Sequence, residues 1–235
     1  MLRNLTLSAM APDDLVALRP HLVERVVARG EVLIPQGHAV EVVHFPITAW
    51  LANTITLGDG QSIDTFVMGV EGVSGLAPFM ANAPCAWGVE ARAGGEIAQI
   101  PASILRARLE KSLPLQRQLL RLTSDYQAQA AINAACAAHH KTTQRLASML
   151  LQTSDRIRKT ELRATQEDLA DILGYRRTTL VDAAQDLKEK GAITYSRGIV
   201  RITDRLRLSS IACECYGYQK ALLAPLVEGD VRQAV

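Results

Sequence analysis

Short apolar runs separated by turn residues dominate the first hundred residues of the chain. The runs lie at residues 32–34, 42–45, 50–57, 62–68, 89–93 and 96–100. Gly58-Asp59-Gly60 and Gly94-Gly95 separate neighbouring runs at hairpin spacing. Ahead of them, Leu15, Leu18 and Leu22 recur at helical spacing. Residues 1–111 are therefore predicted to form an all-β roll or barrel with a helical front.

An alanine-rich stretch without turn residues follows and predicts a long helix over residues 112–138. One stripe of this helix repeats every seven residues and comprises Leu115, Leu119, Leu122, Tyr126, Gln129, Asn133 and Cys136. Such a stripe is typical of a helix that pairs with a copy of itself, and polar Gln129 and Asn133 would fix the register. The alternative is that the stripe packs only on the β domain of its own chain. Dimerisation is the favoured interpretation.

Residues 139–208 contain two short helices joined by a glycine turn, after an amphipathic helix at 142–157 that has Leu146, Met149, Leu150 and Ile157 on one side. Thr165 is the predicted N-cap of the first short helix, and Gly174 ends it. The second short helix starts at Arg176 and ends at Gly191. Its buried side is predicted to be Leu180, Ala183, Ala184 and Leu187.

A predicted β-hairpin follows, in which residues 192–195 and 199–202 flank Ser196-Arg197-Gly198. Two helices, a glycine turn and a hairpin form a winged helix-turn-helix, whose second helix enters the DNA major groove N-terminus first. The predicted DNA-binding residues are Thr165, Gln166, Arg176, Arg177, Thr178, Thr179, Asp182, Lys188 and Arg197. Arg177 is the first choice for a guanine contact.

Charge supports this interpretation only when it is divided along the chain. Residues 1–140 carry 10 Lys and Arg against 12 Asp and Glu, whereas residues 141–208 carry 14 against 9. Concentrated positive charge suits a phosphate backbone, although a solvated basic surface would show the same asymmetry. No apolar run is long enough to span a membrane, and the N-terminus lacks the order of a secretory signal, so we expect a cytoplasmic protein.

The histidines and cysteines do not predict a metal site or any other cofactor. His139 and His140 point in different directions on a helix and have no histidine four residues away, so a hinge or cap role is favoured. Cys213-Glu214-Cys215 supplies only two ligands of an incomplete site, and a buried or surface pair is the favoured alternative to metal binding or oxidation.

The stretch ATQEDLADILGYRRTTLVDAAQDLKEKGAITYSRGIVRI resembles the DNA-binding domain of the Crp/Fnr family of bacterial regulators. The resemblance implies an α+β protein with a cyclic-nucleotide-binding-like β-roll sensor, a long dimerisation helix, a winged helix-turn-helix and a C-terminal tail at 209–235. It implies that the protein is a homodimer and not an enzyme. This homodimer would bind a two-fold symmetric operator, RNA polymerase and an unidentified small-molecule or redox effector.

The effector pocket departs from the family pattern. Glu71 and Gly72 lie near the position of the ribose-binding glutamate, but the Arg-Ser or Arg-Thr pair that binds the cyclic phosphate is replaced by Cys85-Ala86. A buried phosphate would lack its partner there, so cyclic AMP is not expected. No cysteine precedes Cys85, which argues against an Fnr-type iron–sulfur cluster, while Cys85 itself is a redox candidate. The alternatives are a cyclic-nucleotide pocket built differently, or metal-dependent catalysis on the β domain.

Overall fold

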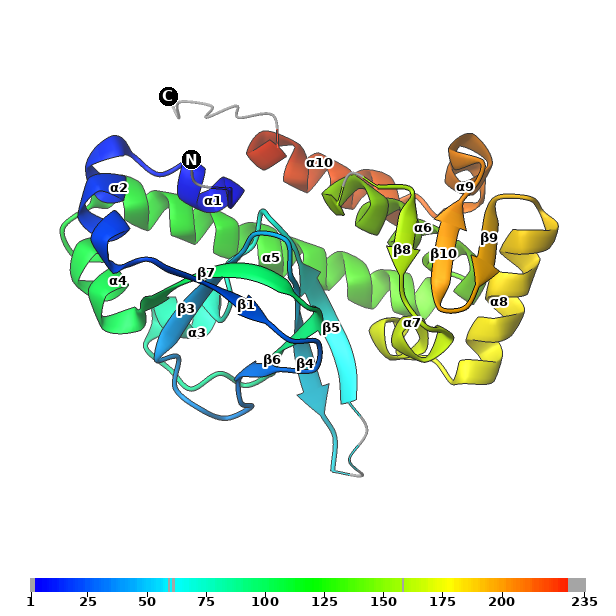
Figure 1. The fold of residues 1–235 in the computed structure, drawn as a ribbon, viewed down its shortest axis with the longest axis horizontal. Helices are drawn as coiled ribbons and strands as arrows, with labels where there is room; N and C mark the ends of the chain where they lie inside the picture. The colour runs from blue at the N-terminus through cyan, green and yellow to red at the C-terminus, as the bar shows by residue number, and fades with distance from the viewer. Residues whose placement is uncertain (1–2, 59, 61, 158, 228–235) are drawn as a thin grey trace. The chain divides into compact units, whose positions relative to one another are not determined.

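The computed structural model describes residues 3–58, 60, 62–157 and 159–227. The chain divides into two compact units, which we call the β unit, made mainly of residues up to 128, and the C-terminal unit, made mainly of residues 129–222. Figure 1 shows the strands of the β unit in blue to green and the C-terminal unit from green to red.

The β unit begins with two short helices and a 3-10 turn and then consists mainly of antiparallel strands. Its elements are α1 (Leu5–Ser8), α2 (Pro12–Leu18), η1 (Arg19–His21), β1 (Val23–Val27), β2 (Val32–Ile34), β3 (Val42–Pro46), β4 (Trp50–Thr56), β5 (Ser62–Met68), α3 (Leu76–Ala81), β6 (Gly88–Ala93), β7 (Gly95–Pro101) and α4 (Ala102–Leu109). They form one sheet in the order β1-β7-β3 and another in the order β2-β6-β4-β5. The predicted N-terminal β domain with a helical front is confirmed, and it also contains α3 and α4.

Alternation of side chains along these strands creates the core of the β unit. Val43 and Phe45 on β3 lie opposite Ile100 and Ala98 on β7, and all four are buried. Strand β1 was not predicted, because an edge strand with a mainly exposed face shows no buried alternation. Val23 and Val26 are both exposed on it.

The long helix α5 (Leu113–His139) is confirmed, but its heptad stripe contacts the chain's own residues. Leu115, Leu119 and Leu122 are fully buried in the core of the β unit. The ring of Tyr126 lies 4.6 Å from that of Phe66, centroid to centroid. The interpretation of this stripe as a dimer seam is therefore wrong, because its side chains are already covered within one chain.

The polar members of that stripe are also engaged inside the C-terminal unit. Gln129 is buried, and its Oε1 accepts a hydrogen bond from Arg156 Nη2 at 3.4 Å. Asn133 Oδ1 accepts one from Gln219 Nε2 at 2.5 Å. These two side chains thus hold α5 against its own chain instead of fixing the register of a dimer.

A different stripe of α5 faces outward at the same three-and-four spacing. Its members, every one of them exposed, are Leu113, Arg117, Leu120, Ser124, Gln127, Ala131, Ala134 and Ala138. Leu120 has 62% of its surface accessible, which is unusual for a leucine on a helix with a buried face. This outward stripe is therefore available to a partner of α5.

The C-terminal unit contains a three-stranded antiparallel sheet in the order β8-β10-β9, surrounded by helices. Its elements after α5 are α6 (Thr142–Ile157), β8 (Glu161–Arg163), α7 (Gln166–Leu173), α8 (Arg177–Glu189), β9 (Ile193–Ser196), β10 (Ile199–Ile202), α9 (Arg205–Ile211) and α10 (Cys215–Val227). Leu146 and Leu150 are buried on α6 and Met149 is partly buried, while the side chain of Ile157 lies outside the described residues. Of the segment expected to be a tail, residues 209–227 include the end of α9 and helix α10, and residues 228–235 lie outside the described residues.

Candidate nucleic-acid interface

Helix α7 begins and ends where its sequence predicts. Thr165 is its N-cap: the Thr165 hydroxyl accepts from the Asp168 backbone N–H at 3.2 Å, and the Asp168 carboxylate accepts from the Thr165 N–H at 2.7 Å. This reciprocal pair is a capping box. Gly174 ends the helix with a φ of 68, in the left-handed region that residues with a side chain rarely adopt. This conformation permits the sharp turn into α8.

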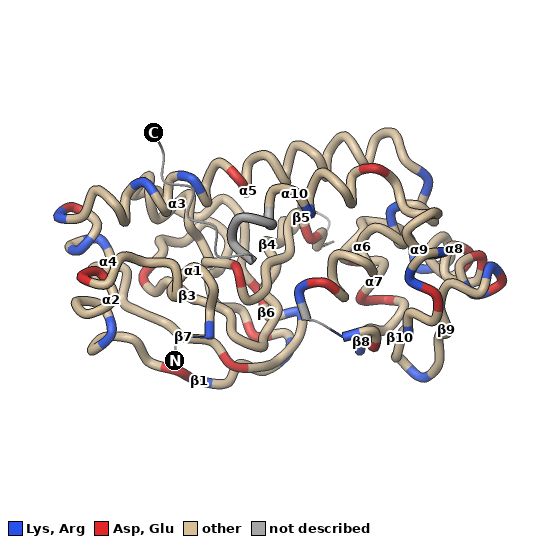
Figure 2. The backbone as a smooth tube through the Cα atoms, turned by 90° about the horizontal axis from the view of Figure 1, so that it is seen from above, with Lys and Arg blue, Asp and Glu red and all other residues tan. Residues whose placement is uncertain are grey.

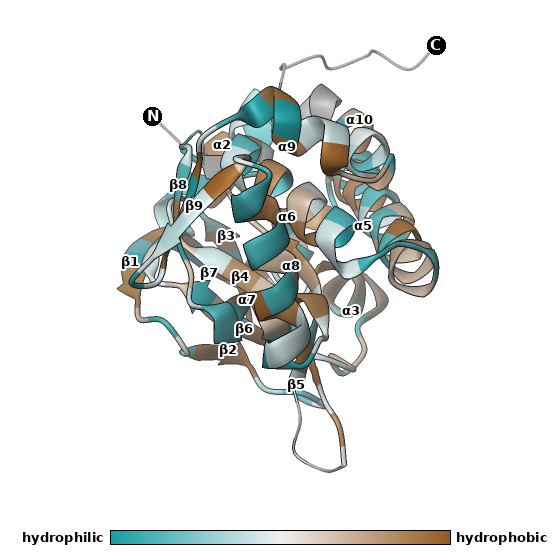
Figure 3. Cartoon of the chain, turned by 90° about the vertical axis from the view of Figure 1, so that its right-hand side faces the viewer, coloured by the Kyte–Doolittle hydropathy of each residue, from teal (hydrophilic) through white to brown (hydrophobic). Residues whose placement is uncertain are grey.

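Helix α8 buries one face and exposes the other. Leu180, Ala183, Ala184 and Leu187 are buried, as predicted. The exposed residues at its start are Arg176, Arg177, Thr178, Thr179 and Asp182. Figure 3 shows α8 carrying both hydrophilic and hydrophobic residues. The polar side that the sequence assigns to DNA is therefore open to solvent.

Arg176 is the N-cap of α8 rather than its first helical residue, and no side chain caps this end. The backbone N–H groups of the first turn thus lack a side-chain acceptor, and the helix dipole adds partial positive charge there. Two arginines beside uncapped N–H groups make a local environment suited to phosphate.

The wing is the hairpin of β9 and β10, and its tip presents a cation. Arg197 and Gly198 form the turn with φ values of 49 and 75, the left-handed pair that a type I′ turn requires. Arg197 is exposed at this tip. Arg201 on β10, by contrast, forms a 2.7 Å ion pair with Glu161 on β8.

The predicted cations differ from their neighbours in having no anionic partner. Within the described part of the chain, no ion pair involves Arg176, Arg177, Lys188 or Arg197, whereas Lys190 pairs with Asp186 at 2.8 Å. Figure 2 shows basic residues in blue and acidic residues in red along the chain. Thr165 and Gln166 lie at the start of α7, so all the predicted residues belong to the two helices and the wing.

Sequence reasoning missed a contact that stabilises the turn between the two helices. Tyr175 follows Gly174, and its hydroxyl accepts a 2.7 Å hydrogen bond from Arg145 Nη1 on α6. The same guanidinium lies 4.9 Å from the centre of the Tyr175 ring. Thirty residues separate the pair, and neither residue lies in a recognisable motif, so no local pattern indicates the contact.

The expected effector residues lie in the β unit in two different surroundings. The buried Glu71 carboxylate accepts a hydrogen bond from the Gly69 N–H at 3.3 Å. The backbone carbonyl of Glu71 accepts one from Thr6 Oγ1 at 2.6 Å. Gly72 beside it approaches Met68 so closely that a Cβ would lie 2.6 Å from the Met68 Cβ. Glu71 and Gly72 therefore belong to a tight turn.

Cys85 and Ala86 differ in exposure. The Cys85 side chain is buried in the core and Ala86 is exposed. Burial raises the pKa of the Cys85 thiol, which disfavours the reactive thiolate. A recess of about 500 Å³ in the β unit is lined by other residues, namely Val40, Glu41, Asn82, Ala102, Ser103, Arg106, Ala107 and Glu110.

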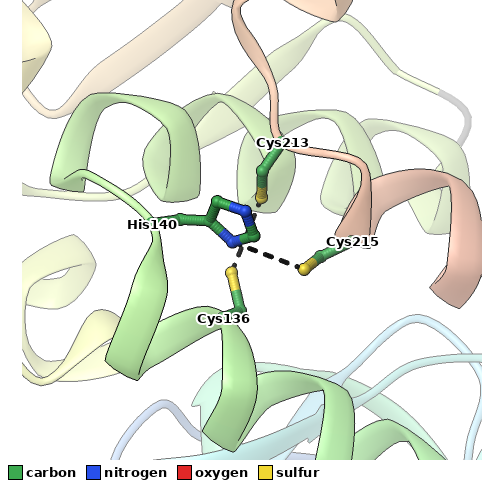
Figure 4. A group of neighbouring side chains, drawn as sticks. All are labelled: Cys136, His140, Cys213 and Cys215. Atoms are coloured by element: carbon green, nitrogen blue, oxygen red, sulfur yellow. Dashed lines mark hydrogen bonds between the residues drawn. The ribbon is translucent and has the colours of Figure 1, made fainter.

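The expectation that no residues gather to bind a metal is wrong. Cys136, His140, Cys213 and Cys215 place their ligand atoms within 4.8 Å of one another (Figure 4). The signal in the sequence was the four-residue spacing of Cys136 and His140, which lie one helical turn apart. A search for histidine at that spacing overlooked the cysteine, and the hinge or cap role assigned to His140 does not account for this cluster.

Comparison with known proteins agrees with this architecture. Residues 144–211 match the model of the Crp-like helix-turn-helix domain. FixK2 from Bradyrhizobium japonicum superposes with a TM-score of 0.70 at 17% identity, covering 82% of this chain and 98% of that one. A CRP/FNR family regulator from Thermus thermophilus superposes at 0.67 with 18% identity, covering 81% and 98%.

The c-di-GMP responsive global regulator CLP of Xanthomonas campestris also superposes, with a TM-score of 0.68 at 15% identity, covering 83% of this chain and all of that one (100%). No curated protein sequence matches this chain. A β-rich unit, a long helix and a helix-turn-helix unit define the fold of the Crp/Fnr-type transcription regulators. Within that fold, residues 144–211 are a Crp-like helix-turn-helix domain. No helix among the described residues is long and apolar enough to cross a bilayer.

Proposed function

We propose that this protein is a sequence-specific DNA-binding transcription regulator that acts as a homodimer on a two-fold symmetric operator. One observation carries the proposal: the first turn of α8 exposes Arg176, Arg177, Thr178 and Thr179 in a Crp-like helix-turn-helix. Exposed cations without an anionic partner in the chain are available to pair with another molecule. Double-stranded DNA, with its phosphate backbone, is the partner that this fold suits.

Each side chain has a distinct role in this proposal. Arg177 donates two hydrogen bonds to the O6 and N7 atoms of a guanine, while Thr178 and Thr179 contact bases or phosphates. Asp182, one turn later, accepts from a cytosine amino group, because a carboxylate there would repel phosphate.

The remaining predicted residues contact the DNA backbone in this proposal. Arg176, Lys188 and Arg197 pair with phosphates, and Thr165 and Gln166 bring the start of α7 to the adjacent backbone. These contacts set orientation and add affinity without selecting a sequence.

The dimer forms through the outward stripe of α5 rather than through the buried one. Its alanines at 131, 134 and 138 allow close approach of two helices, and Leu113 and Leu120 supply exposed apolar surface. In the proposed dimer, the two copies of α8 occupy major grooves about one helical turn, roughly 34 Å, apart.

The effector is proposed to be a ligand other than cyclic AMP. Cys85 and Ala86 offer neither a guanidinium nor a hydroxyl for a cyclic phosphate, and the Glu71 carboxylate already accepts a backbone hydrogen bond. Calorimetric titration with cyclic nucleotides tests this, since saturable heat would restore the cyclic-nucleotide alternative. We further propose that the regulator works in the cytoplasm and acts through RNA polymerase.

The decisive experiment substitutes Arg177→Ala and measures binding to an operator selected from random DNA. Loss of a bidentate guanine contact costs about 1–3 kcal/mol, or roughly 5- to 150-fold in affinity, and relaxes the preference at one base position. Arg19→Ala removes the same charge from an exposed site in the β unit and serves as the control. Unchanged affinity and base preference in Arg177→Ala would overturn the assignment.

A further inference from the structure

Four potential metal ligands converge inside the C-terminal unit from segments far apart in the sequence. Cys136 lies in the last turn of α5, and His140 follows one turn later, where its N–H still donates to the Cys136 carbonyl at 3.0 Å. Cys213 lies in the connection between α9 and α10, and Cys215 is the first residue of α10. Figure 4 shows the His140 ring lying among the three sulfurs.

Two of the distances between these atoms are close to the edges of a tetrahedron around one ion. Zinc–sulfur bonds of about 2.3 Å and zinc–nitrogen bonds of about 2.0–2.1 Å give edges of about 3.8 Å between two sulfurs and about 3.6 Å between sulfur and nitrogen. Cys136 Sγ lies 3.5 Å from Cys213 Sγ, and Cys215 Sγ lies 3.6 Å from His140 Nδ1. The spread is therefore that of a mononuclear centre.

Other uses of these cysteines fit less well. All three are free thiols, and 3.5 Å between Cys136 and Cys213 is far from the bonded distance of a disulfide, about 2.05 Å. An iron–sulfur cluster gives each iron its own protein ligand and so needs more widely spaced cysteines than a group confined within 4.8 Å.

The surroundings orient the ligands as they do in known zinc sites. His140 Nε2 lies 3.2 Å from the Glu214 carboxylate, which holds the proton on Nε2 and turns the lone pair of Nδ1 toward the sulfurs. Ser148 on α6 accepts from the Cys213 N–H at 3.1 Å, and its hydroxyl lies 3.1 Å from Cys213 Sγ. Glu214 thus orients the His140 ring, and the Ser148 hydroxyl contacts the sulfur of Cys213.

We propose that Cys136, His140, Cys213 and Cys215 bind one Zn²⁺ ion in a closed site of three thiolates and one imidazole. Four protein ligands leave no position for water or substrate, so the role is structural rather than catalytic. Without a cation, burial and the neighbouring Cys213 thiol raise the pKa of the Cys136 thiol. Coordination by zinc connects the last turn of α5 to the segment that follows the winged helix.

A network beside the site shows why that tie matters for the DNA-binding helices. Tyr216, next to Cys215, donates to Asp155 Oδ2 on α6 at 2.7 Å and accepts from Arg205 Nη2 on α9 at 2.9 Å. Fixing Cys215 therefore fixes the start of α10 against α6 and α9. Helix α6 also packs directly against α7, α8 and β8 of the DNA-binding domain.

The test measures metal in the purified full-length protein and in matched variants. We expect one zinc per chain by elemental analysis. Titration of the chelator-treated protein with Co²⁺ should give the intense thiolate and visible bands of a tetrahedral centre, saturating at one equivalent. His140→Ala and Cys213→Ser should weaken zinc binding by at least about 100-fold, since loss of a residue that only hydrogen-bonds to a ligand already costs about 10–100-fold. His139→Ala and Cys85→Ser are the matched controls and should bind as the parent does.

Glu214→Gln keeps all four ligands and protects the test against variants that fail to fold. It should fold normally and bind zinc about 10–100-fold more weakly. The proposal is overturned if the parent protein shows neither zinc nor the cobalt spectrum, or if His140→Ala binds as tightly as His139→Ala. It is also overturned if the denatured, unreduced and metal-free chain has fewer than four free thiols.

Discussion

Paired arginines in the β unit contrast with the unpaired cations on the proposed DNA-binding surface of the C-terminal unit. In the β unit, Arg3 lies 2.6 Å from Glu96, Arg25 lies 2.6 Å from Glu31, and Arg108 lies 2.6 Å from the buried Asp14. In the C-terminal unit, the cations at the start of α8 and at the tip of the wing have no such partner among the described residues. Charges that are paired inside a domain serve its stability, while charges left exposed and unpaired are available to a second molecule.

Asp14→Ala breaks the most buried of these pairs and should have the largest effect on stability. Asp14 is 1% exposed and accepts from Arg108 Nε at 2.6 Å and from Ser112 Oγ at 2.8 Å. Its removal leaves both donors without their acceptor and should lower the free energy of unfolding by about 3 kcal/mol. Urea unfolding measures the loss.

Two controls show whether the stability loss of Asp14→Ala comes from the buried ion pair. Arg3→Ala removes two exposed ion pairs, with Glu24 and Glu96, and should destabilise the protein far less. Operator affinity of folded Asp14→Ala should equal that of the parent. A stability loss as small as that of Arg3→Ala would show that this pairing contributes little, and the contrast between the two units would lose its energetic basis.

The comparison also explains which parts of the molecule the sequence could predict. The strands, α5 and α7 follow from local patterns: alternation, the lack of turn residues, and the Thr165 cap with the Gly174 stop. Strand β1 did not follow, because an exposed edge has no apolar alternation. The exposed polar face at the start of α8 was predictable because such residues at a helix start need no long-range contact.

Features that depend on contacts between residues far apart in the sequence were not predictable. The heptad repeat of α5 indicated correctly that one stripe is buried, but periodicity does not identify the surface that covers it. Leu115 and Leu119 meet the chain's own core instead of a second helix. The ligands Cys136 and Cys213 lie 77 residues apart, so only folding reveals their 3.5 Å separation.

His44 should make the stability of the β unit sensitive to pH. It is buried, its Nδ1 lies 2.8 Å from Ser74 Oγ, and burial lowers its pKa from 6.5 to about 4. Since the unfolded chain binds this proton more readily, stability falls as pH drops from about 6.5 toward 4. The expected loss between pH 7 and pH 5 is about 2 kcal/mol.

Urea unfolding of the parent and of His44→Gln at both pH values isolates this contribution. The carboxylates, such as Glu31 and Glu96, titrate in both proteins, so only the difference between the two proteins reports on His44. The parent should lose about 2 kcal/mol more than the variant between pH 7 and pH 5. Equal losses would mean that His44 is protonated without cost, which contradicts its burial.

Arg197→Ala should have the smallest effect and tests the other side of the comparison. The side chain stands at the exposed wing tip without an ion-pair partner in the described part of the chain, so its loss should leave the free energy of unfolding within about 0.5 kcal/mol of the parent. Replacing one phosphate contact should reduce the slope of log affinity against log salt by about 1, uniformly across operator sequences. Arg201→Ala, which removes an arginine already paired with Glu161, should change that slope less. If the two variants lowered the slope equally, pairing within the chain would not decide which cations serve DNA.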